Sequence, residues 1–225
     1  MSEFEGKTVL VTGAAGALGS AVVDHFAGEG AKIAQLDVIK LHDHFSATPD
    51  LTDADACTSA VQAVFQELGS IDILANIAGG FAMGEAVHET SAETWDFLMG
   101  LNAHSVLNMA RAVVPVMLEQ GGGRIINIGA GAGQQGMAQM GAYSASKSVV
   151  IRLTEAMADE LKHQGINVNC ILPSIIDTER NRADMPDADF SAWVTPAAMA
   201  KVVAFLASEA ATPIHGAALP VSGLS

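Results

Sequence analysis

A phenol and an ammonium stand one helical turn apart in the segment Tyr143-Ser144-Ala145-Ser146-Lys147. Residues four apart on a helix share a face, so the two groups can meet in one site. A tyrosine hydroxyl titrates near ~10 and exchanges protons poorly at neutral pH unless a nearby cation stabilises the phenolate. Lys147 can be that cation, and the Gly-rich segment 129–141 before Tyr143 favours an open site. The pair predicts tyrosine-mediated proton transfer; an exposed helix face with the same spacing is the alternative.

A second candidate site is the Gly-rich stretch of residues 9–19, VLVTGAAGALG, which predicts a strand, a turn and a helix. Gly13 can adopt the backbone angles of a tight turn, Gly16 lets main-chain amides approach a pyrophosphate, and Gly19 allows close helix–strand packing. The helix N-terminus adds a partial positive charge. The stretch therefore predicts a dinucleotide site, although its spacing is not GxGxxG and a plain small-residue turn also fits.

Asp37 refines this prediction because it ends the next expected strand, about 20 residues after the glycine turn, where a carboxylate accepts hydrogen bonds from ribose hydroxyls. A carboxylate there would repel the 2′-phosphate of NADP(H), and turn residues 14–16 offer no basic side chain. NAD(H) is therefore favoured. NADP(H) is not excluded, since Lys40 lies close in sequence.

The elements that must position these residues alternate along the chain. Helical spacing joins Leu18, Val22 and Phe26, and the apolar runs between such segments have the composition of strands covered on both faces. This pattern predicts an α/β fold, with residues 1–225 forming a single domain around one Rossmann-type, doubly wound parallel sheet of about seven strands flanked by helices. The strand-like runs are 7–11, 32–36, 71–76, 124–128, 166–172 and 217–221.

Composition excludes several classes of function. The 225 residues carry a formal charge of −14, which disfavours nucleic acid and anionic membranes as partners, and no apolar run reaches the ~20 residues of a membrane span. We also expect no secretory signal. Cys57 and Cys170 lie far apart without a CxxC motif, so we expect reduced thiols and a cytoplasmic protein. The seven histidines form no metal-binding motif, and no metal is expected.

Taken together, the motifs resemble the short-chain dehydrogenase/reductase family over essentially the whole chain. The resemblance implies hydride transfer between a nicotinamide and a small carbonyl or imine-like substrate, and a homo-tetramer or homo-dimer with helices in 101–116 and 146–161 at the interface. It rests on Thr12-Gly13 with Gly16 and Gly19, Asp37, Asp50-Leu51, Asn76-Ile77-Ala78-Gly79, Asn102, Tyr143 with Lys147, Pro173 with Thr178, and the tail 214–223.

The resemblance also implies roles for individual residues. Tyr143 would donate or accept the substrate proton, Lys147 would lower the tyrosine pKa and hold the nicotinamide ribose, and Asn102 would anchor a water relay to that lysine. The implied cofactor-binding residues are Gly13, Gly16, Leu18, Gly19, Asp37, Asp50, Leu51, Asn76, Ala78, Gly79, Tyr143, Lys147, Pro173, Ile176 and Thr178.

The chain departs from the family pattern at Ala130, thirteen residues before the tyrosine, where the family normally has a serine that donates a hydrogen bond to the reacting carbonyl. Ala17 in the glycine turn and Ser174 after Pro173 are milder departures. Either another donor such as Gln134 or Gln135 replaces the serine, or the substrate does not need it. Alternatively, the protein is a catalytically weak dinucleotide-binding protein with a structural or sensing role.

Local similarity to the quinonoid dihydropteridine reductase branch gives a further alternative, because that branch also lacks the serine and reduces a flat ring system. The similarity lies in residues 16–20, 78–81 and 177–193. The polar segment 177–194 is expected to be a surface loop or a substrate lid. Phe81, Met185, Phe190 and Trp193 could stack over a flat substrate or form a small satellite core.

Overall fold

The computed structural model describes residues 2–224, and strands alternate with helices along the chain. The strands are β1 (Thr8–Thr12), β2 (Lys32–Leu36), β3 (Phe45–Ala47), β4 (Ile73–Asn76), β5 (Gly123–Ile128), β6 (Ile166–Pro173) and β7 (Ala218–Val221). The α-helices are α1 (Ala17–Gly28), α2 (Ala54–Leu68), α3 (Ala92–Leu98), α4 (Ser105–Gln120), α5 (Gly141–Leu161), α6 (Glu179–Asp184) and α7 (Pro196–Ala207). A π turn, η2 (Met99–His104), joins α3 to α4, and short 3₁₀ turns include η3 (Gly131–Gly133) and η5 (Phe190–Ala192).

All the strands belong to one parallel sheet with the order β3-β2-β1-β4-β5-β6-β7. The order reverses direction beside β1, where β2 lies on one side and β4 on the other. Every residue of β1 and of β6 is buried, as expected for strands covered on both faces. A crevice for ligands forms at such a reversal, beyond the carboxyl ends of the strands.

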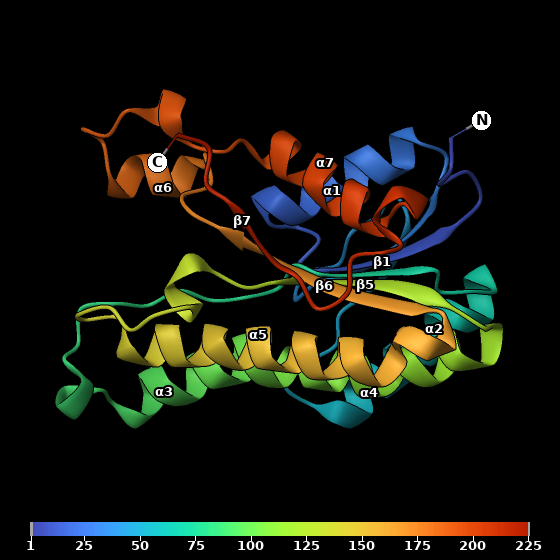
Figure 1. The fold of residues 1–225 in the computed structure, drawn as a ribbon, viewed down its shortest axis with the longest axis horizontal. Helices are drawn as coiled ribbons and strands as arrows, with labels where there is room; N and C mark the ends of the chain where they lie inside the picture. Colours follow the sequence, from blue (N-terminus) through green and yellow to red (C-terminus); the bar gives the residue numbers. More distant parts are fainter. Residues whose placement is uncertain (1, 225) are drawn as a thin grey trace.

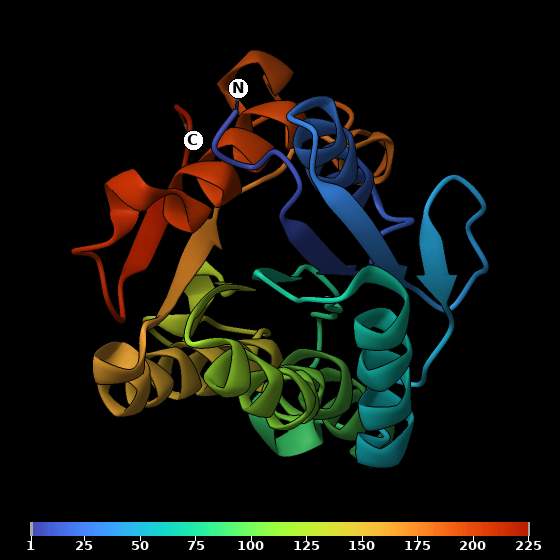
Figure 2. The ribbon, with the colours of Figure 1, turned by 90° about the vertical axis from the view of Figure 1, so that its right-hand side faces the viewer.

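Helices cover both faces of the sheet, so the molecule has three layers (Figures 1 and 2). Alternate residues of β1 point to opposite faces: Val9 and Val11 pack with α1 and α7, whereas Leu10 packs with α2, α4 and α5. This two-sided burial is the main source of stability, at about 25 cal/mol per Å² of apolar surface removed from water. The two cores hold the sheet rigid behind its carboxyl edge.

Helix starts show a difference that bears on function. Asp53, Ser91 and Thr195 cap α2, α3 and α7 by accepting hydrogen bonds from first-turn amides. Helices α1, α4 and α5 have no side-chain cap, and the N-cap residue of α1 is Gly16. The N-terminal dipole of α1 is therefore directed at the glycine turn without a side-chain acceptor.

The parallel seven-stranded sheet predicted from the sequence is confirmed. Two local expectations need correction. The short β3 strand was not among the predicted runs, and segment 177–194 is more than a plain loop, because it contains α6 and η5. Among the described residues, no helix is long and apolar enough to cross a membrane.

Candidate active site

The carboxyl ends of the strands meet along one edge of the sheet, on the left in Figure 1. The beginning of α5, the loop after β4 and the segment with α6 lie at this edge (Figure 1). The predicted site residues lie at the ends of β4 and β6, in the segments that follow β1, β2, β3, β4 and β6, and in α5 and η2. The topology thus brings the two halves of the predicted site to the same edge.

The glycine turn after β1 leaves no room for side chains at two positions. Gly13 has φ +64°, and a Cβ there would lie 2.9 Å from the Cα of Ala78. A Cβ on Gly19 would lie 2.0 Å from the carbonyl oxygen of Gly13, so Gly19 permits the close contact of α1 with the turn. A Cβ on Gly16 would meet only that same oxygen, at 3.4 Å, and packing alone does not require glycine there. The Leu18 side chain is buried in the core between α1 and the sheet.

Asp37, directly after β2, connects its strand to the glycine turn. Its Oδ2 atom accepts a hydrogen bond from the Ala15 amide at 2.9 Å, and Oδ1 accepts one from the Ile39 amide at 3.4 Å. The Lys40 ammonium donates to the Ser46 carbonyl of β3. A carboxylate is therefore fixed beside the turn, while the nearby cation is engaged by the edge strand.

Asp50 and Leu51 form the start of the connection to α2. The amide and hydroxyl of Thr52 donate to Asp50 Oδ1 at 2.8 and 2.7 Å and lower the pKa of that carboxyl. The Leu51 side chain is buried, and its carbonyl accepts a hydrogen bond from Asn108 Nδ2 at 3.0 Å. These bonds fix the backbone of the loop and keep Asp50 ionised at neutral pH.

The end of β4 is held by a buried polar network. Asn76 Nδ2 donates to Asn127 Oδ1 at 2.8 Å, and Asn127 Nδ2 donates to Thr154 Oγ1 at 2.9 Å. The Ala78 amide donates to Thr12 Oγ1 at 3.1 Å. The Asn76 side chain thus links β4 to β5, and the backbone beyond it is tied to β1.

Asn102 is the centre of the contacts that follow β4. It lies in the π turn η2 and is almost fully buried; such turns are frequent at functional sites. Its Oδ1 accepts from the Gly80 amide at 2.9 Å, and its Nδ2 donates to the Gly80 carbonyl and to Ser146 Oγ, each at 3.0 Å. A Cβ on Gly79 would lie 2.9 Å from Asn102 Oδ1 and 3.3 Å from Lys147 Nζ. Asn102, the loop and the lysine therefore form one compact cluster.

Tyr143 and Lys147 lie on successive turns of α5, as their spacing predicts. Lys147 is 4% exposed, and its Nζ donates to the Ile128 carbonyl at 2.8 Å. Burial lowers the pKa of Lys147 to about 8 and raises the pKa of Tyr143 to about 12. The phenol is therefore protonated at neutral pH, and most of the ammonium charge is retained below pH 8.

Ala130 occupies the place where the sequence lacks a serine. It is buried and directly precedes η3, which packs against α5 so closely that a Cβ on Gly133 would lie 2.8 Å from the carbonyl carbon of Lys147. Gln134 and Gln135, the predicted replacement donors, are both exposed. The buried side chain at this position is thus a methyl group, where the family pattern has a hydroxyl.

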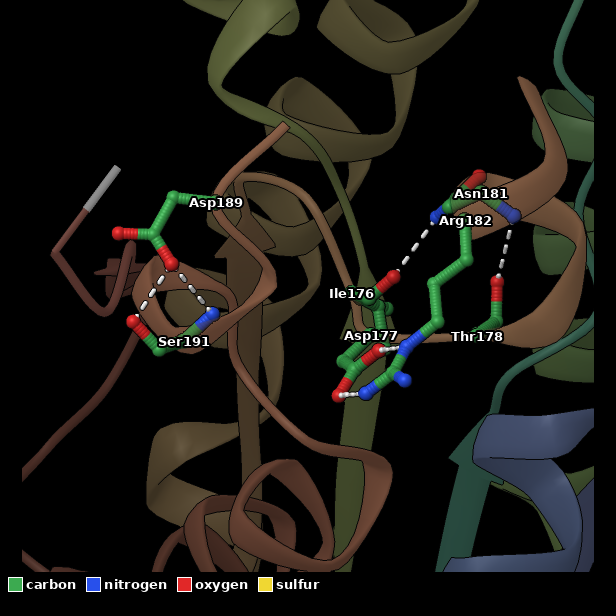
Figure 3. Close-up of polar contacts among 7 residues, drawn as sticks. All are labelled: Ile176, Asp177, Thr178, Asn181, Arg182, Asp189 and Ser191. Carbon is green, nitrogen blue, oxygen red and sulfur yellow. Dashed lines mark hydrogen bonds and ion pairs between the residues drawn. The ribbon is translucent and has the colours of Figure 1, made fainter. Parts of the chain in front are cut away.

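The segment after β6 carries the remaining predicted residues. Pro173 pairs with Val221 of β7 at the end of the sheet. Further along, Asn181 Nδ2 donates to the Ile176 carbonyl at 2.8 Å, and the Asn181 amide donates to Thr178 Oγ1 at 3.2 Å (Figure 3). Thr178 therefore caps α6, and one asparagine connects both predicted residues to that helix.

An ion pair also joins two residues of this segment (Figure 3). Arg182 donates to both carboxylate oxygens of Asp177, at 2.5 and 2.7 Å, and lowers the pKa of that carboxyl. The guanidinium lies 4.8 Å from the ring centre of Phe190, which packs on the mostly buried Trp193. Phe190 and Trp193 thus pack within this segment, as the satellite-core alternative expected.

Sequence reasoning assigned no contact to three residues that hold the site together. Thr12 receives the Ala78 amide, Gly80 is bound on both sides by the Asn102 amide group, and Ser146 donates to the Tyr143 carbonyl at 2.9 Å. Ser146 offered a signal, since it lies three residues after the tyrosine on the same helix. The other two contacts join segments far apart in sequence and gave no local signal.

Comparison with known proteins identifies the family. The model of the short chain dehydrogenase family matches residues 7–189 of the chain. D-threitol dehydrogenase of Mycolicibacterium smegmatis is 34% identical over 244 residues, covering 98% of this chain and 93% of the relative. The 3-oxoacyl-[acyl-carrier-protein] reductase of Vibrio cholerae is 32% identical over 239 residues, covering 98% and 97%. The chain belongs to the short-chain dehydrogenase/reductase family and is an oxidoreductase of that class.

A solved structure supports the same assignment. Carveol dehydrogenase from Mycobacterium avium, in complex with NAD, superposes with a TM-score of 0.89 at 27% identity, covering 100% of this chain and 99% of that chain. None of the relatives named here is a dihydropteridine reductase, and the similarity to that branch stays a prediction.

Proposed function

We propose that this protein is an NAD(H)-preferring oxidoreductase that interconverts a small carbonyl or imine-like compound and its reduced form. The observation that carries the proposal is the cluster of Tyr143, Lys147, Asn102 and Gly79 at the carboxyl edge of the sheet. This cluster lies at the same edge as a glycine turn in which a Cβ would collide with backbone at Gly13 and Gly19.

The residues at this edge fit a nicotinamide dinucleotide. The glycine turn and the uncapped start of α1 form a cradle for a pyrophosphate, and Asp37 offers a carboxylate for ribose hydroxyls. When bound, the cofactor supplies or accepts a hydride. Further contacts are assigned to Leu18, Asp50, Leu51, Asn76, Ala78, Gly79, Pro173, Ile176 and Thr178. The Asn76 contact comes from the backbone, because its side chain is bonded to Asn127.

Proton transfer is assigned to the α5 pair. Tyr143, protonated at neutral pH, donates its hydroxyl proton to the substrate oxygen or nitrogen during reduction and accepts it back during oxidation. The Lys147 ammonium stabilises the resulting phenolate and binds the nicotinamide ribose. Asn102 anchors the water relay that returns a proton to Lys147. General acid catalysis of this kind contributes about 10²- to 10⁴-fold to the rate.

The preference for NAD(H) follows from charge. The Asp37 carboxylate is fixed by the Ala15 amide beside the turn, where a 2′-phosphate would face a like charge. Lys40 does not offset this charge, since its ammonium is engaged by the Ser46 carbonyl. The net charge of the chain, −14, also disfavours the additional phosphate of NADP(H).

Ala130 favours a second candidate function, a dinucleotide-binding protein with little turnover and a structural or sensing role. The methyl group cannot donate the hydrogen bond that a serine would give to a reacting carbonyl. Retention of Tyr143, Lys147 and Asn102 in one cluster supports turnover instead.

One screen separates these functions. NADH oxidation is measured against ketones, quinones and quinonoid dihydropterin, and NADH binding is measured in parallel by fluorescence. Oxidation with a ketone or quinone supports the proposed function, and oxidation with dihydropterin alone favours the dihydropteridine reductase alternative. Tight NADH binding without oxidation of any substrate supports the second candidate.

We further propose a cytoplasmic homo-tetramer or homo-dimer that uses the outer surfaces of α4 and α5. Leu118 on α4 and Trp95 and Phe97 on the neighbouring α3 are large apolar side chains at least 40% exposed, which a subunit contact would cover. Light scattering after size-exclusion chromatography tests the proposal, and a mass near the 23.1 kDa of one chain contradicts it.

A further inference from the structure

Phe81 lies directly against the proposed proton donor. Its ring centre is 4.9 Å from that of Tyr143, with the two planes at 84°, an edge-to-face contact. Phe81 is nevertheless 49% exposed. An apolar ring that contacts the ring of the proposed proton donor therefore keeps part of its surface open to a ligand.

The backbone before Phe81 is fixed on several sides. The Asn102 side-chain amide binds both the amide and the carbonyl of Gly80. A Cβ on Gly80 would lie 2.7 Å from the Phe97 ring and 3.2 Å from Leu101, so the backbone at Gly80 sits tightly against η2 and α3. Phe81 thus extends from a held position, which lowers the entropy cost of using it for recognition.

The residues that follow Phe81 in the loop line a hollow with both apolar and polar walls. This hollow, between the loop and the residues before α5, has a volume of about 60 Å³. Its lining includes the apolar Ala82, Met83 and Met140 and the polar Thr90, Thr94 and Gln139. Glu85 also lines it, and its carboxylate is held by the amide and hydroxyl of Ser91 at 3.1 and 3.4 Å. This carboxylate disfavours an anionic substrate.

The reaction also needs a second constraint on the substrate. One hydrogen bond from Tyr143 leaves the substrate free to rotate about that bond, and Ala130 offers no second donor. A flat ring stacked on Phe81 would remove this freedom, because its plane would be fixed relative to Tyr143.

We propose that Phe81 determines substrate specificity by stacking on a neutral, flat, conjugated ring that carries the reducible group. The proposal rests on the proposed function and names its substrate class. Phe81 takes no part in the chemical step, and its contribution is contact with the substrate.

The test uses matched substrates that differ in ring planarity. Acetophenone is paired with cyclohexyl methyl ketone, and isatin with cyclohexane-1,2-dione, and kcat/KM is measured with NADH for each. The variants are Phe81→Leu, which removes the ring, and Phe81→Tyr, which keeps it. Phe65→Leu is the control, since Phe65 is 40% exposed and lies near the end of α2, at the opposite edge of the sheet.

We expect the wild type to prefer the aromatic partner, and Phe81→Leu to lower the aromatic-to-saturated ratio about 3- to 10-fold, the effect of one aromatic contact. Phe81→Tyr keeps most of the ratio and Phe65→Leu keeps all of it. An unchanged ratio in Phe81→Leu, or an equal loss for both partners, overturns the proposal, because Phe81 would then only support Tyr143. If the wild type oxidises NADH with none of the four ketones and with none of the compounds in the screen described above, the proposed function is contradicted instead.

Discussion

The buried Lys147 ammonium should make the free energy of unfolding depend on pH. Its pKa is lowered from 10.5 to about 8 by burial, and the charge is therefore less favourable in the folded state than in the unfolded chain. Between these two values the unfolded chain holds the proton and the folded protein has released it. The unfolded state then binds more protons, so folding stability rises with pH across this interval.

The perturbation is Lys147→Met, a substitution of similar length without charge. From the two pKa values, the free energy of unfolding of the wild type should increase by about 1.4 kcal/mol between pH 7 and pH 9, relative to the variant. Below pH 7 the difference between the two proteins should be constant. The variant also leaves the Ile128 carbonyl without its donor, which costs about 1–3 kcal/mol at every pH.

Urea denaturation at pH 7, 8 and 9 measures both proteins. Tyr143, Cys57 and Cys170 also have raised pKa values, and the folded protein therefore loses stability as they titrate at higher pH. These residues are present in both proteins, so their effect cancels in the difference except for the charge interaction between Cys170 and Lys147, which the variant lacks. A wild-type-minus-variant difference that stays flat from pH 7 to pH 9 would refute the reasoning.

Three further predictions concern the cofactor site and the segment after β6. Asp37→Ala should weaken NADH binding about 10-fold or more, which is the effect of losing a hydrogen bond to a charged group. It should also reduce the difference in affinity between NADH and NADPH. Equal affinities of the wild type for the two cofactors would show that the charge argument is wrong. Gly19→Ala should abolish NADH binding and lower the melting temperature, because its Cβ would lie 2.0 Å from the carbonyl oxygen of Gly13. Gly28→Ala on the same helix should do neither, because no atom lies within 4 Å of a Cβ placed there. Arg182→Ala should speed amide hydrogen exchange in residues 176–194, because it removes the Arg182–Asp177 ion pair. Arg180→Ala should change the exchange little, since the Arg180 guanidinium lies 3.8 Å from the Asp184 carboxylate. Equal protection in both variants would contradict an ordering role for the Arg182–Asp177 pair.

The sheet could be predicted from the sequence because burial on both faces gives long apolar runs. β6 shows the principle well, since all eight of its residues are buried and its run contains few polar side chains. β3 could not be predicted in the same way. It has three residues, Phe45–Ala47, and pairs only with β2 at the sheet edge, so it shows no periodicity long enough to recognise.

The Tyr143 and Lys147 pair could be predicted because helix geometry fixes the relation of residues four apart. The contact of Asp37 with the Ala15 amide and that of Asn102 with Gly80 each span 22 residues, and they depend on how loops meet at the sheet edge. The periodicity of apolar residues does not indicate which loops contact each other. The Arg182–Asp177 pair was missed for a related reason, since it crosses the start of α6 rather than following one helix face.

The central claim, that Tyr143 transfers the proton in a reaction dependent on NAD(H), is tested most directly with Tyr143→Phe. The substitution keeps the ring that contacts Phe81 and removes only the hydroxyl. With a ketone accepted by the wild type, kcat should fall about 10²-fold or more, while NADH affinity stays within about threefold. Retention of the wild-type kcat by Tyr143→Phe would contradict the account.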